Sequence, residues 1–196
     1  NIRWIDQKLN EYFNKLYKTN DDYIIASDTD SVYINMAPLV KMTGATDKDK
    51  IVKALDTFCQ ERLEPYIAKV YGELGNYMNV RENKMVMKRE AIADKGIWTA
   101  KKRYILNVHN SEGVQYPEPK LKIMGIEAVK TSTPLPCRDK LKEAFKVIMG
   151  GDQKEMKEFI VNFRREFELM KPEEIAFPRS VNGVKKYTDT TSIYKK

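Results

Sequence analysis

The stretch YIIASDTDSVYINM, residues 23–36, decides the fold that the sequence predicts. It contains two runs, Tyr23–Ala26 and Ser31–Met36, that are rich in the β-branched and aromatic residues favoured in strands. The polar connection SDTD, residues 27–30, is short enough to close a hairpin between them. We therefore expect two antiparallel strands with the two acidic residues of this connection at their tip.

Helical patterns flank the hairpin on both sides. Apolar residues recur at helical spacing over residues 2–16, where they share one face: Ile5, Leu9, Tyr12 and Leu16. A second helical pattern runs from residue 49 to 79, and we expect Pro65 to kink or divide it. These helices are expected to pack against the hairpin sheet.

Further strands follow the second helical region. Residues 85–92 and 97–108 have strand composition and are joined by Ala93-Asp94-Lys95-Gly96, and residues 121–127 form a third run after a loop with two prolines. The sequence thus predicts an α+β fold, in which helices pack on an antiparallel sheet.

After Thr133-Pro134-Leu135-Pro136 the sequence alternates charged residues with apolar residues at helical spacing. We place a domain boundary there, with one domain over residues 1–132 and another over 133–196. The second is predicted to be small and helical. One helix is expected to stop at Gly150-Gly151, and Asp152 is expected to cap another that pairs with it. Residues 172–196 show little periodicity.

The composition bounds the classes of function. The 196 residues carry 35 Lys and Arg against 28 Asp and Glu, a formal charge of +7, which is compatible with an anionic partner such as a nucleic acid. No run approaches the roughly 18 apolar residues of a membrane span, so we expect no membrane partner. The two cysteines, Cys59 and Cys137, lie far apart in unrelated surroundings and are expected to stay reduced. A helical pattern already runs at residue 2, and we expect the chain to be a fragment of a larger protein.

The motif Asp28-Thr29-Asp30-Ser31 is the strongest candidate for chemistry. Residues two apart in an extended segment project to the same side, which puts the two carboxylates about 6 to 7 Å apart. Hard oxygen ligands on a short turn suit Mg²⁺, and two such ions can stabilise the attacking and leaving oxygens of a phosphoryl transfer. The alternative is an ordinary turn, for which Asp and Thr are common residues.

A basic run, Lys101-Lys102-Arg103-Tyr104, is expected to open a strand. Alternation would send Lys102 and Tyr104 to one face, where the cations hold a phosphate backbone and the ring packs on a sugar or base. The alternative is a solvated edge strand protected by lysines.

Two other titratable residues, Glu90 and His109, lie outside the acidic and basic motifs. Glu90 is a single carboxylate in an otherwise apolar predicted strand, where a salt bridge is the default expectation. His109 is the one histidine of the chain and adjoins the turn-like sequence NSEG, so we expect it in a surface loop and exclude it from the site.

The order of these pieces resembles the family B DNA polymerases. An Asp-Thr-Asp-Ser hairpin at 28–31 followed by Lys-Lys-Arg-Tyr at 101–104 is similar to the palm of these enzymes from its third carboxylate motif onward. MKREAI at 87–92, Trp98, LKIMGIE at 121–127 and STP at 132–134 look like the T-even phage branch. The resemblance covers the chain to about residue 135 and identifies residues 1–132 as the C-terminal part of the palm and 133–196 as the beginning of the thumb.

The resemblance implies roles for individual residues. Asp30 matches the carboxylate that binds the catalytic metals, Asp28 its neighbour, and Glu90 an acidic residue near the metal site. Lys102 and Tyr104 match the motif that contacts the primer end through the minor groove. Supporting contacts to DNA would come from Lys101, Arg103 and Lys122.

The activity implied is that of a DNA-directed DNA polymerase in phage DNA replication. In that reaction a primer 3′-hydroxyl attacks the α-phosphate of a deoxynucleoside triphosphate (dNTP) paired with template DNA and pyrophosphate leaves, with two Mg²⁺ ions as cofactors. Its place of action would be the cytoplasm of the infected bacterial host. The first carboxylate motif, the fingers that hold the dNTP and the exonuclease are not found in this sequence. We therefore expect an N-terminal polymerase part as partner, and an inactive chain without it.

Two rival functions remain open at this stage. A phosphatase of the haloacid dehalogenase type also places Asp-x-Asp after an apolar strand, but its usual sheet is parallel. A nucleic-acid-binding module without catalytic function would need the basic run and not the carboxylates.

Overall fold

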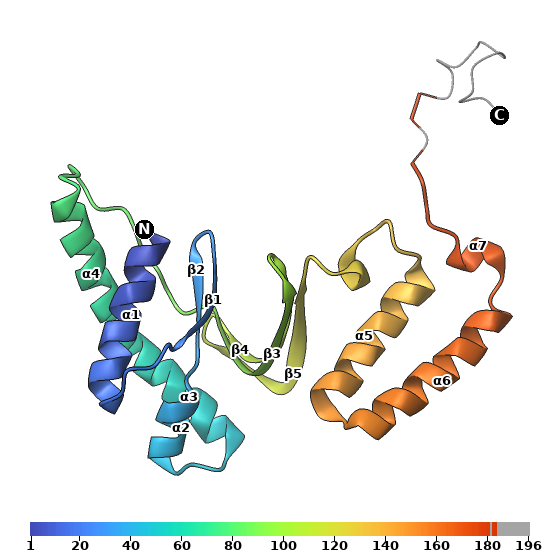
Figure 1. Ribbon diagram of the computed structural model, residues 1–196, viewed down its shortest axis with the longest axis horizontal. Coiled ribbons are helices and arrows are strands. Elements are labelled where there is room, and N and C mark those ends of the chain that lie inside the picture. Colours follow the sequence, from blue (N-terminus) through green and yellow to red (C-terminus); the bar gives the residue numbers. More distant parts are fainter. Residues whose placement is uncertain (181, 184–196) are drawn as a thin grey trace. The chain divides into compact units, whose positions relative to one another are not determined.

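A computed structural model describes residues 1–180 and 182–183 of the chain (Figure 1). The chain divides into two compact units, Asn1–Lys122 and Ile123–Lys196, and each is described by itself. Helices and antiparallel strand pairs are both present, so the predicted α+β class is confirmed.

The core of the first unit lies between two helices and the first hairpin. Helix α1 (Ile2–Tyr17) buries Ile5, Leu9 and Phe13 completely. Ile5 and Leu9 were predicted on this face, whereas Leu16, also predicted there, is exposed and Phe13 was not predicted. The buried side chains pack against α4 (Glu64–Tyr77), which lies beside α1 in Figure 1. The apolar face of α1 therefore anchors the chain directly before the strand that leads to the acidic motif.

The acidic hairpin forms as predicted. Strand β1 (Ile24–Asp28) pairs with β2 (Ser31–Ile34) in antiparallel fashion, and Asp28 is opposite Ser31 at the last step of the ladder. The loop is thus only two residues long, Thr29 and Asp30. Val32 and Ile34 pack against the helical core, which fixes the hairpin on the helices.

The region between the hairpin and α4 is helical but interrupted. A short helix that the sequence analysis missed, α2 (Ala37–Thr43), precedes α3 (Lys48–Phe58), whose first turn is capped by Asp47. The predicted division near Pro65 is confirmed, although it takes the form of a π-helical turn, η1 (Cys59–Leu63), and Pro65 lies in the first turn of α4.

The second sheet differs from the prediction in three places. Its order is β3 (Ala91–Ala100), β4 (Arg103–Ser111) and β5 (Val114–Met124), with β3 and β4 antiparallel. The strand predicted at 85–92 is wrong up to residue 90, because residues 83–90 belong to no strand, while Ala91 and Ile92 begin β3. The turn expected at 93–96 is wrong as well, since β3 continues through it with register shifts around Ala93 and Lys95, and the chain turns at residues 101–102. Strand β5 begins earlier than expected and includes both prolines, which its position at the edge of the sheet permits.

The second unit is helical. A 3₁₀ turn, η2 (Glu127–Val129), leads into α5 (Leu135–Gly150), which packs against α6 (Gln153–Leu169) as predicted, and a short α7 (Pro172–Ile175) follows. Asp152 caps α6 by accepting hydrogen bonds from the backbone N–H groups of Lys154 and Glu155, at 2.8 and 2.9 Å. The predicted division of the chain into palm and thumb parts stays a prediction.

No helix in the described part of the chain is both long and apolar enough to span a bilayer. The thiols of Cys59 and Cys137 are free, as expected, and burial raises the pKa of Cys59 to about 11.

Candidate active site at the tips of two hairpins

The acidic turn has a strained and well-defined backbone. Thr29 has φ = 52°, in the left-handed region that β-branched residues rarely adopt. The carbonyl oxygen of Asp28 accepts hydrogen bonds from the Asp30 N–H at 2.6 Å and from the Ser31 hydroxyl at 3.1 Å. The Thr29 hydroxyl donates to the Asp28 carboxylate at 3.0 Å. The motif therefore folds back on itself instead of continuing as extended chain.

This turn separates the surroundings of the two carboxylates. Asp28 is half-buried and lies toward the second sheet, 3.8 Å from the Lys102 ammonium. Asp30 is exposed on the turn, and its charge acts on Tyr71 of α4, whose pKa is raised mainly by burial and further by Asp30. We had expected Asp28 and Asp30 to project to the same side of an extended strand. That assumption about the backbone was wrong, because Thr29 and Asp30 form the loop.

The basic run forms a second tight turn. Ala100 pairs with Arg103, which leaves Lys101 and Lys102 as the two loop residues between β3 and β4. Both are exposed, and Lys102 has φ = 61°. Arg103 is half-buried at the start of β4, where its carbonyl accepts a hydrogen bond from the Thr99 hydroxyl at 3.2 Å. The prediction that this run opens a strand holds only from Arg103 onward.

A pocket of about 320 Å³ lies between the two turns. It is lined by residues of both hairpins: Ala26, Ser27, Asp28, Tyr33, Trp98, Ala100, Lys101, Lys102 and Tyr104. The pocket thus collects four of the eight predicted site residues, although they come from two hairpins that are separated by about seventy positions of sequence.

Tyr104 forms the floor of this arrangement. Tyr104 is 7% exposed. Strand alternation predicted that Tyr104 and Lys102 share one accessible face, but Tyr104 is buried and Lys102 is exposed. Burial raises the pKa of Tyr104 strongly, and a hydrogen bond with Tyr33 and the negative charges of Glu90 and Asp28 raise it further. The hydroxyl therefore stays protonated and uncharged at neutral pH.

Glu90 and Lys122 meet on the same side of the sheet. The Lys122 ammonium donates a hydrogen bond to the Glu90 carboxylate. The pair is partly open to solvent, because the Lys122 side chain is 30% exposed and the Glu90 side chain 58%. The expected salt bridge of Glu90 is thus present, although Glu90 directly precedes β3 instead of lying within a strand. The charge of Glu90 also contributes to the raised pKa of Tyr104.

Arg89 holds the backbone that carries Glu90. Its guanidinium is paired with the Asp56 carboxylate of α3 and donates to the Asn110 side chain of β4 at 2.8 Å. The Arg89 N–H donates to Glu64 at the start of α4, at 3.0 Å. With side chains only 9% and 18% exposed, Arg89 and Asp56 form a nearly buried ion pair that ties the helices to the sheet.

His109 does not lie in a surface loop, and that expectation was wrong. It belongs to β4, is 7% exposed, and its Nε2 lies 3.2 Å from the Asp94 carboxylate. Burial acts to raise the pKa of Asp94, but a hydrogen bond from Asn107 and the neighbouring His109 and Lys48 outweigh it, so the pKa is lowered. The cluster joins β3 to β4 away from the pocket lining.

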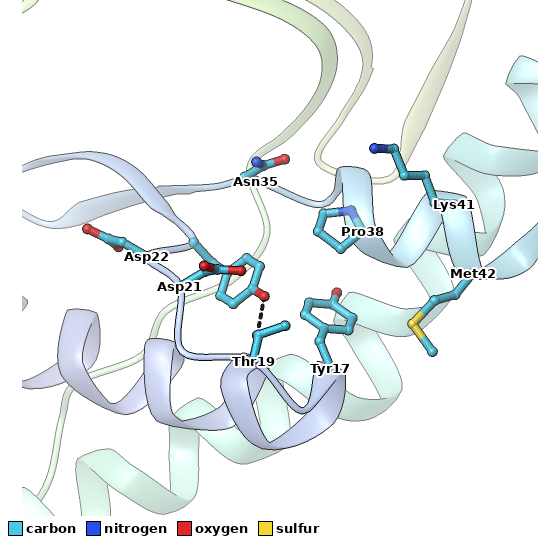
Figure 2. Close-up of a pocket in the computed structure, with 9 residues that line it drawn as sticks. Tyr17, Thr19, Asp21, Asp22, Asn35, Pro38, Lys41 and Met42 are labelled. Atoms are coloured by element: carbon cyan, nitrogen blue, oxygen red, sulfur yellow. Dashed lines mark hydrogen bonds between the residues drawn. The ribbon is translucent and has the colours of Figure 1, made fainter.

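A larger pocket, of about 660 Å³, lies at the end of α1 and contains none of the predicted site residues (Figure 2). Thr19 and Tyr23 share a hydrogen bond there, at 2.5 Å. The pKa of Tyr17 is raised to about 12, chiefly by burial, and its hydroxyl has no hydrogen-bond partner in the described part of the chain. Asp21, Asp22 and Lys41 line this pocket, but none of them belongs to the predicted acidic or basic motif, so size alone does not make this pocket the site.

The described residues hold no cluster of three or more His, Cys, Asp or Glu side chains able to ligate a metal. Asp28 and Asp30 thus supply at most part of a metal site. Sequence reasoning also missed what joins the two hairpins. The rings of Tyr33 and Trp98 are in contact. The one sequence pattern that could have indicated this contact is the alternation of aromatic residues along the two strands.

Two phage polymerases are similar to nearly the whole of this chain. No family model matches the chain. The DNA-directed DNA polymerase of Enterobacteria phage T4 is 38% identical over 200 residues, which cover 96% of this chain and 22% of that protein. That of Escherichia phage RB69 is 38% identical over 198 residues, with 95% and 22% coverage. The chain thus spans about a fifth of the length of these relatives, and the resemblance to polymerases of the T-even phages is confirmed.

Proposed function

Because this chain is homologous to a segment of the phage DNA-directed DNA polymerases, we propose that it forms part of such an enzyme, a nucleotidyltransferase of phage DNA replication. It would supply one metal-binding carboxylate motif and a basic turn that contacts the primer. The observation that supports this most is the meeting of Asp28 with Lys102 across one pocket.

The two turns suit opposite tasks. Asp30 is exposed on a loop whose backbone is fixed by hydrogen bonds to Asp28, as a ligand shared with another part of a polymerase needs to be. Asp30 and Asp28 would hold Mg²⁺ together with a carboxylate from outside this chain. Hard oxygen donors fit that ion, and when bound it would neutralise phosphate charge.

Lys101 and Lys102 would bind the backbone of the primer. Both project from a two-residue turn into solvent, and cations in this position attract phosphates without reading sequence. The Lys102 ammonium would lie between the Asp28 carboxylate and the DNA, so that it limits repulsion between the acidic turn and the phosphates. Arg103, half-buried behind the turn, would support its position.

Tyr104 would remain a neutral partner of the primer end. Its pKa is raised well above neutrality by burial, so an ionised phenolate would not repel the phosphates. A hydroxyl at the floor of the pocket suits contact with minor-groove acceptors, which all correct base pairs share. Such a contact would test the shape of the base pair at the primer end and not its sequence.

Glu90 would act near the metal site through its charge and through Lys122. The ion pair orients the Lys122 ammonium while leaving part of it in solvent, where a phosphate of the primer can replace one hydrogen bond. In this proposal Glu90 is the acidic residue that keeps Lys122 beside the pocket before DNA arrives.

The partners follow from the segment that the chain matches. Template and primer DNA, a dNTP, and an N-terminal polymerase part with the first carboxylate motif, the fingers and the exonuclease would complete the enzyme. The site of action would be the cytoplasm of the infected bacterial host. The antiparallel pairing of β1 with β2 disfavours the phosphatase alternative, which uses a parallel sheet.

The test is primer extension with Mg²⁺ and dNTPs, for this chain alone, for the N-terminal polymerase part alone, and for their mixture. Asp30→Asn and Asp28→Asn are compared with Asp21→Asn, a loop aspartate that lines the larger pocket instead. We expect extension only in the mixture, loss with Asp30→Asn, and normal extension with Asp21→Asn.

A mixture that forms a complex and binds DNA, but never extends a primer, would point to a non-catalytic DNA-binding module. Extension that survives Asp30→Asn would exclude this residue as the metal ligand.

A further inference from the structure

The geometry points to Tyr33 as a positioning residue that joins the acidic hairpin to the basic turn. This inference rests on the proposed function, because it concerns how Asp28 is held opposite Lys102. Tyr33 itself contacts neither phosphate nor metal in this scheme. It would act by fixing the two hairpins relative to each other.

The two hairpins are not joined by a common sheet. Within the described residues, β1 and β2 form one sheet, and β3, β4 and β5 form another. The relative position of Asp28 and Lys102 is therefore set by side-chain packing and not by a ladder of backbone hydrogen bonds.

Tyr33 provides that packing from the acidic hairpin. Its ring lies 5.2 Å from the Trp98 ring and 5.4 Å from the Tyr104 ring, both in edge-on geometry. These are favoured arrangements of aromatic pairs. Tyr33 is also the member of the apolar cluster around Tyr104 that comes from the acidic hairpin.

The strand register places Tyr33 on the face that carries Asp28. Ala26 is opposite Tyr33, and Asp28 is opposite Ser31, two positions further along each strand. Residues two apart on a strand, and residues directly opposite each other, share a face of the sheet. A movement of the Tyr33 ring against Trp98 would thus shift the Asp28 carboxylate in the same direction.

The partner rings of Tyr33 are themselves fixed. Tyr104 is buried in β4 and shares a hydrogen bond with Tyr33. Trp98 lies against Gly96, where an added Cβ would come within 2.7 Å of the ring. We call the contact of Tyr33 with Trp98 and Tyr104 the joint between the two hairpins. Trp98 and Tyr104 form its rigid side, and Tyr33 packs against them from the acidic hairpin.

The experiment compares Tyr33→Leu, which removes the ring, with Tyr33→Phe, which keeps it and removes the hydroxyl. Tyr12→Leu is the matched control, because Tyr12 also packs in an aromatic group of the first unit, against Phe13 and Tyr66. Thermal melting of each variant first establishes that it folds. Single-turnover extension and DNA affinity are then measured in the mixture with the N-terminal polymerase part.

We expect Tyr33→Leu to slow extension about five- to tenfold, as the loss of two ring contacts implies, with DNA affinity changed less than about twofold. Tyr33→Phe should retain the rate within about twofold. In a Lys102→Met background the further effect of Tyr33→Leu should largely vanish, because coupled residues are not additive. An equal effect in both backgrounds, or an equal loss with Tyr12→Leu, would overturn the inference.

A readout without activity separates this inference from the proposed function. The chain has two tryptophans, and 5-fluorotryptophan gives one ¹⁹F signal for each, assigned with Trp4→Phe. Tyr33→Leu should shift the Trp98 signal and leave the Trp4 signal in place. If the wild-type mixture fails to extend primers, the proposed function falls, while an unshifted Trp98 signal overturns the joint whether or not extension occurs.

Discussion

Gly96→Ala is expected to destabilise the first unit although it adds a residue with better strand propensity. A Cβ at this position would lie 2.7 and 2.8 Å from ring carbons of Trp98 and 2.8 Å from a methyl group of Leu106. All three distances are shorter than real Cβ contacts. The Trp98 ring is packed in the joint with Tyr33 and cannot move away without breaking that contact.

Two effects of opposite sign decide the magnitude. Replacing a strand glycine by alanine gains about 0.5 to 1 kcal/mol from the lower entropy of the unfolded chain. Overpacking a well-filled site costs about 1 to 3 kcal/mol. We expect a net loss of about 1 to 2 kcal/mol, which lowers the Tm by roughly 3 to 8 °C.

The assay is thermal melting followed by tryptophan fluorescence, because Trp4 and Trp98 both lie in the first unit. Gly72→Ala is the control, since it lies in α4 with nothing within 4 Å of the added Cβ and should raise the Tm. If Gly96→Ala melts at or above the wild-type temperature, the packing of Trp98 on Gly96 is not as described and the rigid side of the joint is lost.

Three further outcomes follow from contacts outside the pocket. Arg89→Met should cost about 3 to 5 kcal/mol in urea unfolding, because it leaves the Asp56 carboxylate nearly buried without its partner, and a cost below about 1 kcal/mol would contradict the buried pair. The folded-state pKa of Asp94 is lowered, so its contribution to stability is present above the unfolded pKa of about 3.9 and is lost as the pH falls through the folded pKa. Asp94→Asn should therefore lower the Tm at pH 7, and this difference from wild type should shrink in melts below about pH 4, whereas Asp21→Asn should show no such trend. Asp152→Ala should cost about 0.5 to 2 kcal/mol and reduce the helical signal in circular dichroism, because it removes two hydrogen bonds at the start of α6, and an unchanged signal would show that the cap is dispensable.

Local patterns predicted the elements that depend on local physics. The face of α1 and the acidic hairpin follow from apolar spacing, because each buries one side against the same core. The cap of α6 follows from Asp152, since a short acidic side chain satisfies the first N–H groups of a helix.

The errors occurred where distant contacts override local preference. Gly96 was interpreted as a turn residue, but its missing side chain makes room for the Trp98 ring within a continuous strand. Residues 85–92 were predicted as a strand from their composition, yet Arg89 bonds to α3 and to β4 and holds the part before β3 between the helices and the sheet. His109 adjoins a turn, but Asp94 on the neighbouring strand gives its buried ring a polar partner.

For the candidate site, the sequence predicted the kinds of residues and not their arrangement. Asp28 and Lys102 are 74 positions apart, and nothing local indicates that their turns face one pocket. The prediction for Asp28 and Asp30 assumed an extended segment, whereas Thr29 closes the turn in a left-handed conformation that strand geometry does not include.

Both turns place a non-glycine residue in the left-handed region, Thr29 on one side of the pocket and Lys102 on the other. Such a residue costs about 1 to 2 kcal/mol relative to glycine. Selection of variants for heat resistance alone would therefore favour glycine at both positions. The lysine replacement would remove one of the charges that line the pocket, so a library screened only for folding would enrich proteins that melt later and lack one cation of the candidate site.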